Sequence, residues 1–132
     1  MKRHVELEFA ADPAGADEAA RRVAALLERV TPEVAFACEL AVAEACANIA
    51  RHGFAGATGT MRVVARASDA RLAVAICDRA PEFAGAAPPM PPAEAEGGRG
   101  LPLLAASMDR VRWHRADGEN RLLMARRLDV CS

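Results

Sequence analysis

Two polar side chains with complementary chemistry lie one helical turn apart in the stretch ELAVAEACANIARHG, residues 39–53. At about 100° per residue, Glu44 and Asn48 are separated by about 40° around a helix, and Arg51 falls beside them. His52 lies about 80° from Glu44, at the border of the same face. A carboxylate and a carboxamide presented together suit a proton acceptor beside a cation ligand. The alternative is the polar flank of an ordinary surface helix, so the catalytic interpretation requires a phosphate loop and an acidic anchor elsewhere.

An acidic residue and a glycine-rich loop supply those further parts. Asp78 follows the nearly continuous apolar run Arg71–Cys77. A charge there is either the first solvated residue or a group that reads the polar edge of a ligand. The loop GGRG at 97–100 precedes a segment, 101–108, that suits a helix with Pro102 in its first turn. Such a loop presents free N–H groups and the positive end of a helix dipole to phosphate, although a plain helix entry has the same pattern.

Hydrophobic periodicity predicts the elements that would position these residues. Thr31-Pro32-Glu33 is typical of a helix start, because it offers an N-cap, a proline at the first helical position and an acid near the positive dipole end. Residues 79–97 hold five of the eight prolines without any period, which is typical of a lid or binding loop. We expect strands at His4–Ala10, Thr60–Ala67 and Arg71–Cys77, a turn at Asp12-Pro13-Ala14-Gly15, helices at Ala16–Val30 and from Thr31 to Gly53, and a hairpin of Arg110–Arg115 and Asn120–Leu128 around Asp117-Gly118-Glu119. Helices on one face of a mostly antiparallel sheet give a two-layer α+β sandwich.

Composition narrows the class of protein. The 132 residues fit one domain, 1–132. The net charge of -1, with both signs scattered along the chain, predicts neither nucleic acid nor anionic membrane as a partner. No apolar run approaches the roughly 20 residues that span a bilayer. The first residues, MKRHVELE, alternate like a strand and lack the apolar core of a secretion signal, so we expect a cytoplasmic protein.

The four cysteines raise the question of a metal site or a disulfide. Cys38, Cys46, Cys77 and Cys131 show no CxxC spacing, and each lies among apolar neighbours. Cys38 and Cys46 are about 80° apart around a helix, which is not the geometry of a tight ligand pair. Buried, reduced thiols are therefore expected. The same lack of ligand spacing disfavours a metal-dependent hydrolase that uses His52 and the cysteines.

Three motif blocks in this order resemble the anti-sigma-factor serine/threonine kinases of the RsbW type, which are small relatives of the histidine-kinase and gyrase ATPases. The blocks are ELAVAEACAN with IARH at 39–52, DRAPEF at 78–83 and GRGL at 98–101. The closing hairpin also fits, so the similarity covers nearly the whole chain. The first block is fairly specific, and the other two gain weight from their order. The resemblance implies the histidine-kinase-like ATPase (Bergerat) fold, with residues 79–97 as an ATP lid.

The resemblance assigns the chemistry to the second helix. Glu44 would be the general base that takes the proton from a protein serine or threonine hydroxyl. Asn48 would ligate Mg²⁺, which in turn holds the ATP phosphates. His52 occupies a nucleotide-site position that is usually histidine in such proteins. These roles suit phosphoryl transfer, in which catalysis is mainly positioning and charge neutralisation.

The resemblance places the rest of the nucleotide on other elements. Asp78 would accept a hydrogen bond from the adenine amino group. Gly98, Arg99 and Gly100 would wrap the phosphates, with the Arg99 guanidinium beside the outermost one. Asn120 stands where relatives often carry threonine near the adenine.

One position departs from the family pattern. Relatives commonly have glycine two residues after the adenine-reading aspartate, whereas this chain has Ala80, followed by Pro81. A methyl group and a rigid ring would either narrow the adenine pocket or stiffen it. Nucleotide affinity is therefore the implied property that this departure affects most.

The resemblance implies a regulatory protein kinase that takes part in partner switching. It would phosphorylate an anti-sigma-factor antagonist protein and sequester a sigma factor or another regulator, and relatives often form homodimers. The alternative is an interaction module that has kept the fold and lost catalysis. The pocket residues discriminate between the two, because an inactive module has no need for Glu44.

Overall fold

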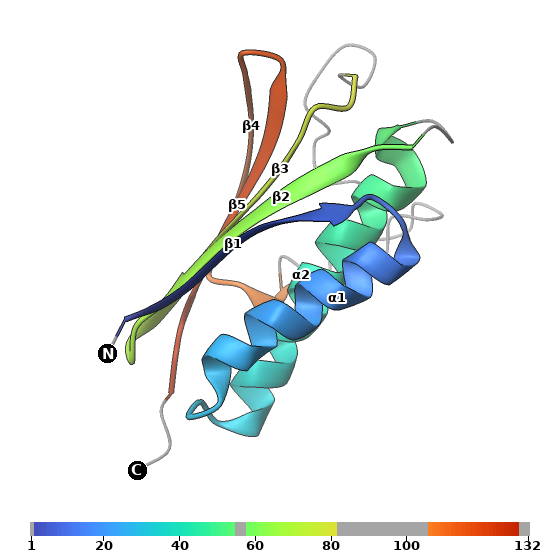
Figure 1. Cartoon of the computed structure of the whole chain (residues 1–132). Coiled ribbons are helices and arrows are strands. Elements are labelled where there is room, and N and C mark those ends of the chain that lie inside the picture. The colour runs from blue at the N-terminus through green and yellow to red at the C-terminus, as the bar shows by residue number, and fades with distance from the viewer. Residues whose placement is uncertain (1, 55–57, 82–105, 130–132) are drawn as a thin grey trace.

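An antiparallel five-stranded sheet forms one layer of the protein, and two helices cover one of its faces (Figure 1). The structure is a computed structural model that describes residues 2–54, 58–81 and 106–129. The strands are β1 (Arg3–Ala10), β2 (Thr60–Ala67), β3 (Arg71–Asp78), β4 (Arg110–Ala116) and β5 (Glu119–Arg127), and the helices are α1 (Pro13–Ala24) and α2 (Pro32–Asn48). This arrangement confirms the predicted two-layer α+β fold.

The register of the sheet decides which residues face the helices. The strand order is β1-β2-β3-β5-β4, and every described neighbour pair is antiparallel. One row across the helix-facing side runs through Leu7, Val63, Ile76, Leu122 and Trp113, and all five are apolar. Since side chains alternate between the two faces of a strand, the same side of every strand contributes to the core. The buried apolar residues of this face and of both helices form the hydrophobic core.

The first helix begins earlier and ends earlier than the predicted Ala16–Val30. Asp12 is its N-cap, since the carboxylate Oδ1 accepts a hydrogen bond of 2.7 Å from the Gly15 N–H, and Pro13 is its first residue. The segment Asp12-Pro13-Ala14-Gly15 is therefore a helix start, whereas the sequence pattern suggested a turn. At the other end, α1 stops at Ala24 and tightens into the 3-10 turn Ala25–Leu27.

The second helix begins where predicted, with Pro32 at its first position and Thr31 as the preceding residue. The Thr31 side chain makes no capping hydrogen bond, so the acid Glu33 and the proline carry the start signal. The helix continues to Asn48 and then widens into a π-helix, Ile49–Gly53. Because the π-helical turn is wider than an α-helical turn, the angular positions predicted for the residues after Asn48 do not apply.

The closing hairpin has a tight two-residue turn. Asp117 and Gly118 have φ angles of 55° and 73°, respectively, which suit a type I′ connection between twisted strands. Glu119 pairs with Ala116, so it belongs to β5 and not to the turn. Within the predicted helix 101–108, residues 106 and 107 are helical. The glycine-rich loop and most of the predicted lid, 82–97, lie outside the described residues.

No helix in the described parts of the chain is both long enough and apolar enough to cross a membrane.

Candidate functional site

The helix-facing side of the sheet becomes polar in its last row. The register aligns Phe9, Met61, Asp78, Asn120 and Arg115 across the five strands. Asp78 is only 7% exposed although it is a carboxylate at the end of a strand. It is therefore not simply the first solvated residue after the apolar run. A buried carboxylate needs hydrogen-bond donors, and the neighbouring strand provides one.

Asp78 is held by two donors on the same oxygen. Its Oδ1 accepts hydrogen bonds of 2.9 Å from the Ala80 N–H and 2.9 Å from the Asn120 side-chain amide. Within the described residues, no hydrogen bond involves the other oxygen, Oδ2. This second oxygen can accept a hydrogen bond from an amino group of a ligand.

Asn120 and Arg115 fix the backbone that follows Asp78. The Ala80 carbonyl accepts hydrogen bonds of 3.0 Å from Asn120 Nδ2 and 3.2 Å from Arg115 Nη1. Arg115 Nη1 also donates to Asn120 Oδ1, at 2.5 Å. Ala80 is 1% exposed, and its N–H and C=O are both used by the protein itself. Ala80, at the position where the resemblance leads us to expect glycine, is therefore held by hydrogen bonds at both its N–H and its C=O.

A cavity of about 470 Å³ lies beside Asp78 at the ends of β2 and β3. It also reaches residues of the outer sheet face, which is the face that the helices leave uncovered. Its described lining residues are Glu8, Phe54, Gly59, Thr60, Arg62, Cys77, Asp78, Arg79 and Glu119. Neither Glu44 nor Asn48 is among them. This cavity by itself therefore does not connect Asp78 with the predicted catalytic pair on α2.

Glu119 is a buried acid on the wall of this cavity and is 8% exposed. Its pKa is lowered, first by the hydrogen bond from Arg121 Nε, which is 2.7 Å from Oε1. Arg62 contributes from β2, on the far side of β3, with Nη2 3.7 Å from Glu119 Oε2. Glu119 is therefore an ionised group that these two arginines neutralise.

The predicted catalytic pair lies on α2. Glu44 and Asn48 are both half-buried, one turn apart, on the flank of the helix stripe that packs into the core. No hydrogen bond or ion pair within the described residues involves either side chain. Arg51 and His52 are exposed on the π-helical turn that follows. A half-buried carboxylate and amide that have no partner among the described residues are suited to bind a ligand or a cation.

Two of the predicted site regions lie at the same end of the molecule. The C-terminal end of α2 and the C-terminal end of β3 are both found at the end that carries the β4–β5 turn (Figure 1). The structure joins Asp78 directly to Asn120, as the hydrogen bond between them records. Gly98, Arg99 and Gly100 lie outside the described residues. The predicted phosphate loop therefore stays a prediction.

Sequence reasoning did not identify Arg115 and Glu119 as parts of the site. Both positions follow from strand register, because Arg115 pairs with Asn120 and Glu119 pairs with Ala116. The available signal was the alternation of the closing hairpin, which places Arg115 on the same side as Trp113. A charged residue on that otherwise apolar side needs a polar partner.

The predicted burial of the cysteines is confirmed for the three that the structure describes. Cys38, Cys46 and Cys77 are buried and free. Burial raises the pKa of the Cys38 thiol to about 11 and that of the Cys46 thiol to about 12. The described residues contain no group of three or more histidine, cysteine or acidic side chains arranged to hold a metal ion.

The sequence pattern of one family matches most of the chain. The histidine kinase-like ATPase domain matches residues 9–126, so the chain belongs to that family. This result confirms the superfamily that the three motif blocks indicated. None of the curated proteins that were compared matches the chain.

A solved structure has the same fold. It is the crystal structure of the RsbU and RsbW domains of Rv1364c from Mycobacterium tuberculosis, which aligns with a TM-score of 0.65 and 17% sequence identity. The alignment covers 96% of this chain and 32% of that chain. At this identity the likeness concerns the fold, and this chain spans about a third of the length of the matched one.

Proposed function

We propose that this chain is an anti-sigma-factor-type serine/threonine protein kinase that binds Mg-ATP. In this proposal it phosphorylates an anti-sigma-factor antagonist and sequesters a sigma factor or another regulator by partner switching. The observation that carries the proposal is the buried Asp78 carboxylate. One of its oxygens is fixed by Asn120 and Ala80, and the other has no donor in the described residues. Family membership supports ATP as the nucleotide.

In this proposal, some residues bind the nucleotide and the metal ion, and one residue transfers a proton. Asp78 would accept a hydrogen bond from the adenine amino group, with Asn120 holding the carboxylate in position. Asn48 would ligate Mg²⁺ through its side-chain oxygen, and an amide oxygen suits this hard cation. Glu44 would take the proton from the substrate hydroxyl. ATP would supply the phosphoryl group and leave as ADP, and Mg²⁺ would neutralise part of the charge on the phosphates.

The remaining assignments concern the phosphates and the helix end. Gly98, Arg99 and Gly100 would wrap the phosphates, and His52, on the π-helical turn, would belong to the nucleotide site. π-Helical turns occur frequently at functional sites, which supports a role for the segment Ile49–Gly53.

Nucleotide binding is the first test. Isothermal titration with Mg-ATP should detect binding to the native chain, and Asp78→Asn should weaken it by about tenfold or more because the oriented acceptor is altered. Asp17→Asn is the matched control, since Asp17 is an exposed acid on α1. Failure to bind ATP at millimolar concentration would overturn the kinase proposal and favour the inactive interaction module.

Phosphoryl transfer is the second test. A partner captured from native cell extract and identified would be incubated with labelled ATP and the chain. Glu44→Ala should lower transfer by about a hundredfold or more while leaving ATP affinity nearly unchanged. Glu39→Ala is the control, because Glu39 is a second half-buried acid on the same helix. Unimpaired transfer in Glu44→Ala would remove Glu44 from the catalytic role.

A further inference from the structure

The helices leave the outer face of the sheet uncovered (Figure 1), and the centre of this face is apolar. The register places Ala73, Ala75 and Ala125 side by side on β3 and β5, with Val64 and Leu123 in line with Ala75. Leu123 is 40% exposed and is one of only three large apolar side chains exposed in the described residues. Because alanine is shorter than its neighbours, the centre of this face is lower than its margin. We call these five residues the apolar floor.

Arginines form the margin of this floor. Ala73 pairs with Arg66, Ala125 with Arg110 and Leu123 with Arg112, while Arg71 lies at the end of β3. We call these four residues the rim arginines. Together with the floor they line a groove of about 420 Å³, and no acidic side chain is among its described lining residues.

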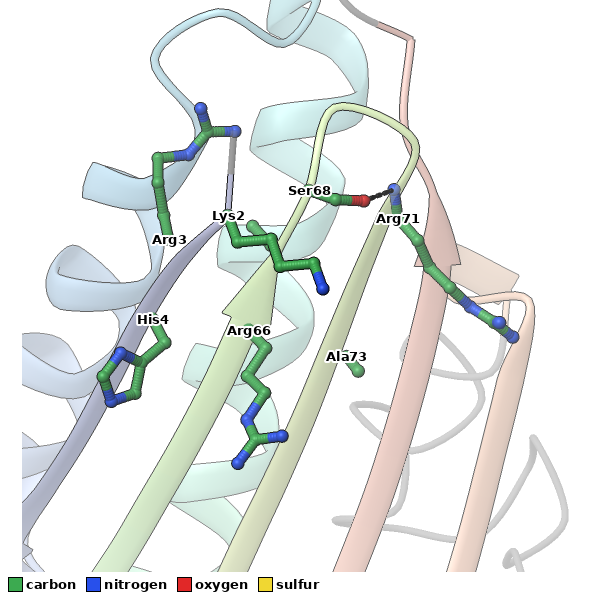
Figure 2. Close-up of a pocket in the computed structure, with 8 residues that line it drawn as sticks. Lys2, Arg3, His4, Arg66, Ser68, Arg71 and Ala73 are labelled. Carbon is green, nitrogen blue, oxygen red and sulfur yellow. Dashed lines mark hydrogen bonds between the residues drawn. The ribbon is translucent and has the colours of Figure 1, made fainter.

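A second groove, of about 490 Å³, continues the same surface toward β1. It shares two rim arginines and Ala73 with the first groove and adds Lys2, Arg3 and His4. Figure 2 shows Lys2, Arg66 and Arg71 around Ala73, whereas Arg3 extends away from them. Three cationic side chains therefore border the edge of the apolar floor.

The rim arginines have no carboxylate partner among the described residues, in contrast to the arginines at the opposite end of the same face. There, Arg62 lies 3.7 Å from Glu6 and 3.7 Å from Glu119, and Arg121 lies 2.7 Å from Glu119. Within the described residues, no carboxylate forms an ion pair with any rim arginine. Among the described residues, one end of the face is thus internally neutralised, and the other end has positive charge that no described carboxylate pairs with, around an apolar surface.

We propose that this floor and rim bind a partner protein whose contact surface presents apolar side chains bordered by carboxylates. Arginine around a small apolar centre is typical of protein interfaces, and the charge complement of the rim is acidic. A second copy of this chain would bring like charges together. Single-stranded nucleic acid would find no phenylalanine, tyrosine or tryptophan to stack on, because the described outer face carries none of these side chains.

The inference does not rest on the proposed kinase activity. The floor and rim lie on the outer face, whereas Asp78, Asn120 and Arg115 lie in a row that faces the helices. Binding can therefore be measured without nucleotide. A chain that fails to bind ATP could still bind the acidic partner, and the reverse also holds.

Three labelled probes test the inference by fluorescence anisotropy. The first is a short peptide that alternates glutamate and leucine, the second replaces leucine by serine at the same length, and the third is an oligothymidine. We expect the glutamate–leucine peptide to bind most tightly. Equal binding of the two peptides would overturn the proposal, because it would show that apolar contacts are not needed. Tighter binding of oligothymidine would also overturn it, because it would identify a nucleic-acid surface.

Variants of the chain complete the test. Arg66→Ser with Arg112→Ser should weaken binding of the first peptide by about three- to thirtyfold, and Leu123→Ser should weaken it by about tenfold. Arg21→Ser with Arg22→Ser removes the same charge from the exposed surface of α1 and should leave binding unchanged. Equal loss in the control, or unchanged binding in the rim variant, would overturn the proposal. The proposal would also be overturned if the native chain sediments as a dimer and Leu123→Ser sediments as a monomer, because a second copy would then be the occupant of this surface.

Discussion

Replacing Asn120 by alanine would remove the centre of the polar network at the end of β3. Asn120 donates to the Asp78 carboxylate at 2.9 Å and to the Ala80 carbonyl at 3.0 Å, and it accepts from Arg115 at 2.5 Å. Two of these three hydrogen bonds involve a charged group. The network joins residues 42 positions apart in the chain, so its loss should destabilise the contact between β3 and β5.

The expected loss follows from the partners that remain. A hydrogen bond contributes about 0.5–1.5 kcal/mol net, or about 1.5–3 kcal/mol where one group is charged. Asp78 Oδ1 keeps the Ala80 N–H, and the Ala80 carbonyl keeps Arg115. Because neither acceptor is left without a donor, we expect the free energy of unfolding to fall by about 2–4 kcal/mol, less than the full contribution of all three bonds.

Urea unfolding followed by the fluorescence of Trp113, the single tryptophan, measures this change. For a domain of this size, the midpoint should fall by about 1–2 M urea. Asn48→Ala is the matched control, because Asn48 is half-buried and has no partner in the described residues. Asn120→Thr keeps a hydroxyl donor and should give an intermediate loss. If Asn120→Ala costs no more than Asn48→Ala, the network does not stabilise the fold and the reasoning is refuted.

Three further predictions concern other parts of the molecule. The Arg121 hydrogen bond lowers the pKa of Glu119 below its ordinary value of 4.5, so its stabilisation is present above pH 4.5 and lost as the pH falls through the lowered pKa. Glu119→Gln should therefore reduce the difference in stability between neutral and acidic pH, and an unchanged acid-unfolding profile would contradict this. Gly15→Ala should destabilise the chain by about 1–3 kcal/mol in thermal unfolding, because a Cβ would lie 1.8 Å from the Ala10 carbonyl oxygen; a stabilised variant would be evidence against that contact. Cys46, with a pKa raised to about 12 by burial, should resist alkylation at pH 8 in the native chain and react in urea, and rapid native labelling would show that it is accessible.

Local patterns determined much of the fold. Period-2 alternation predicted β2 at Thr60–Ala67 with the bounds that the structure has. The Thr31-Pro32-Glu33 signal located the start of α2, and helical spacing placed Glu44 and Asn48 on one flank. These features depend on neighbours a few residues apart, so a single sequence contains the information. The start of α1 was also encoded, since Asp12 and Pro13 are an N-cap and first-residue pair that the sequence analysis assigned to a turn.

The order and register of the strands were decided only by the tertiary structure. Pairing of β3 with β5 brings Asp78 to Asn120, and the hairpin then adds Arg115 to the same row. Asn120 entered the sequence analysis through family resemblance, because no local period links it to Asp78. The same register gathers the alanines of the outer face between the rim arginines. Residues far apart in the chain become neighbours only when the strands pair. The register of that pairing depends on contacts between distant segments, which local sequence patterns do not specify.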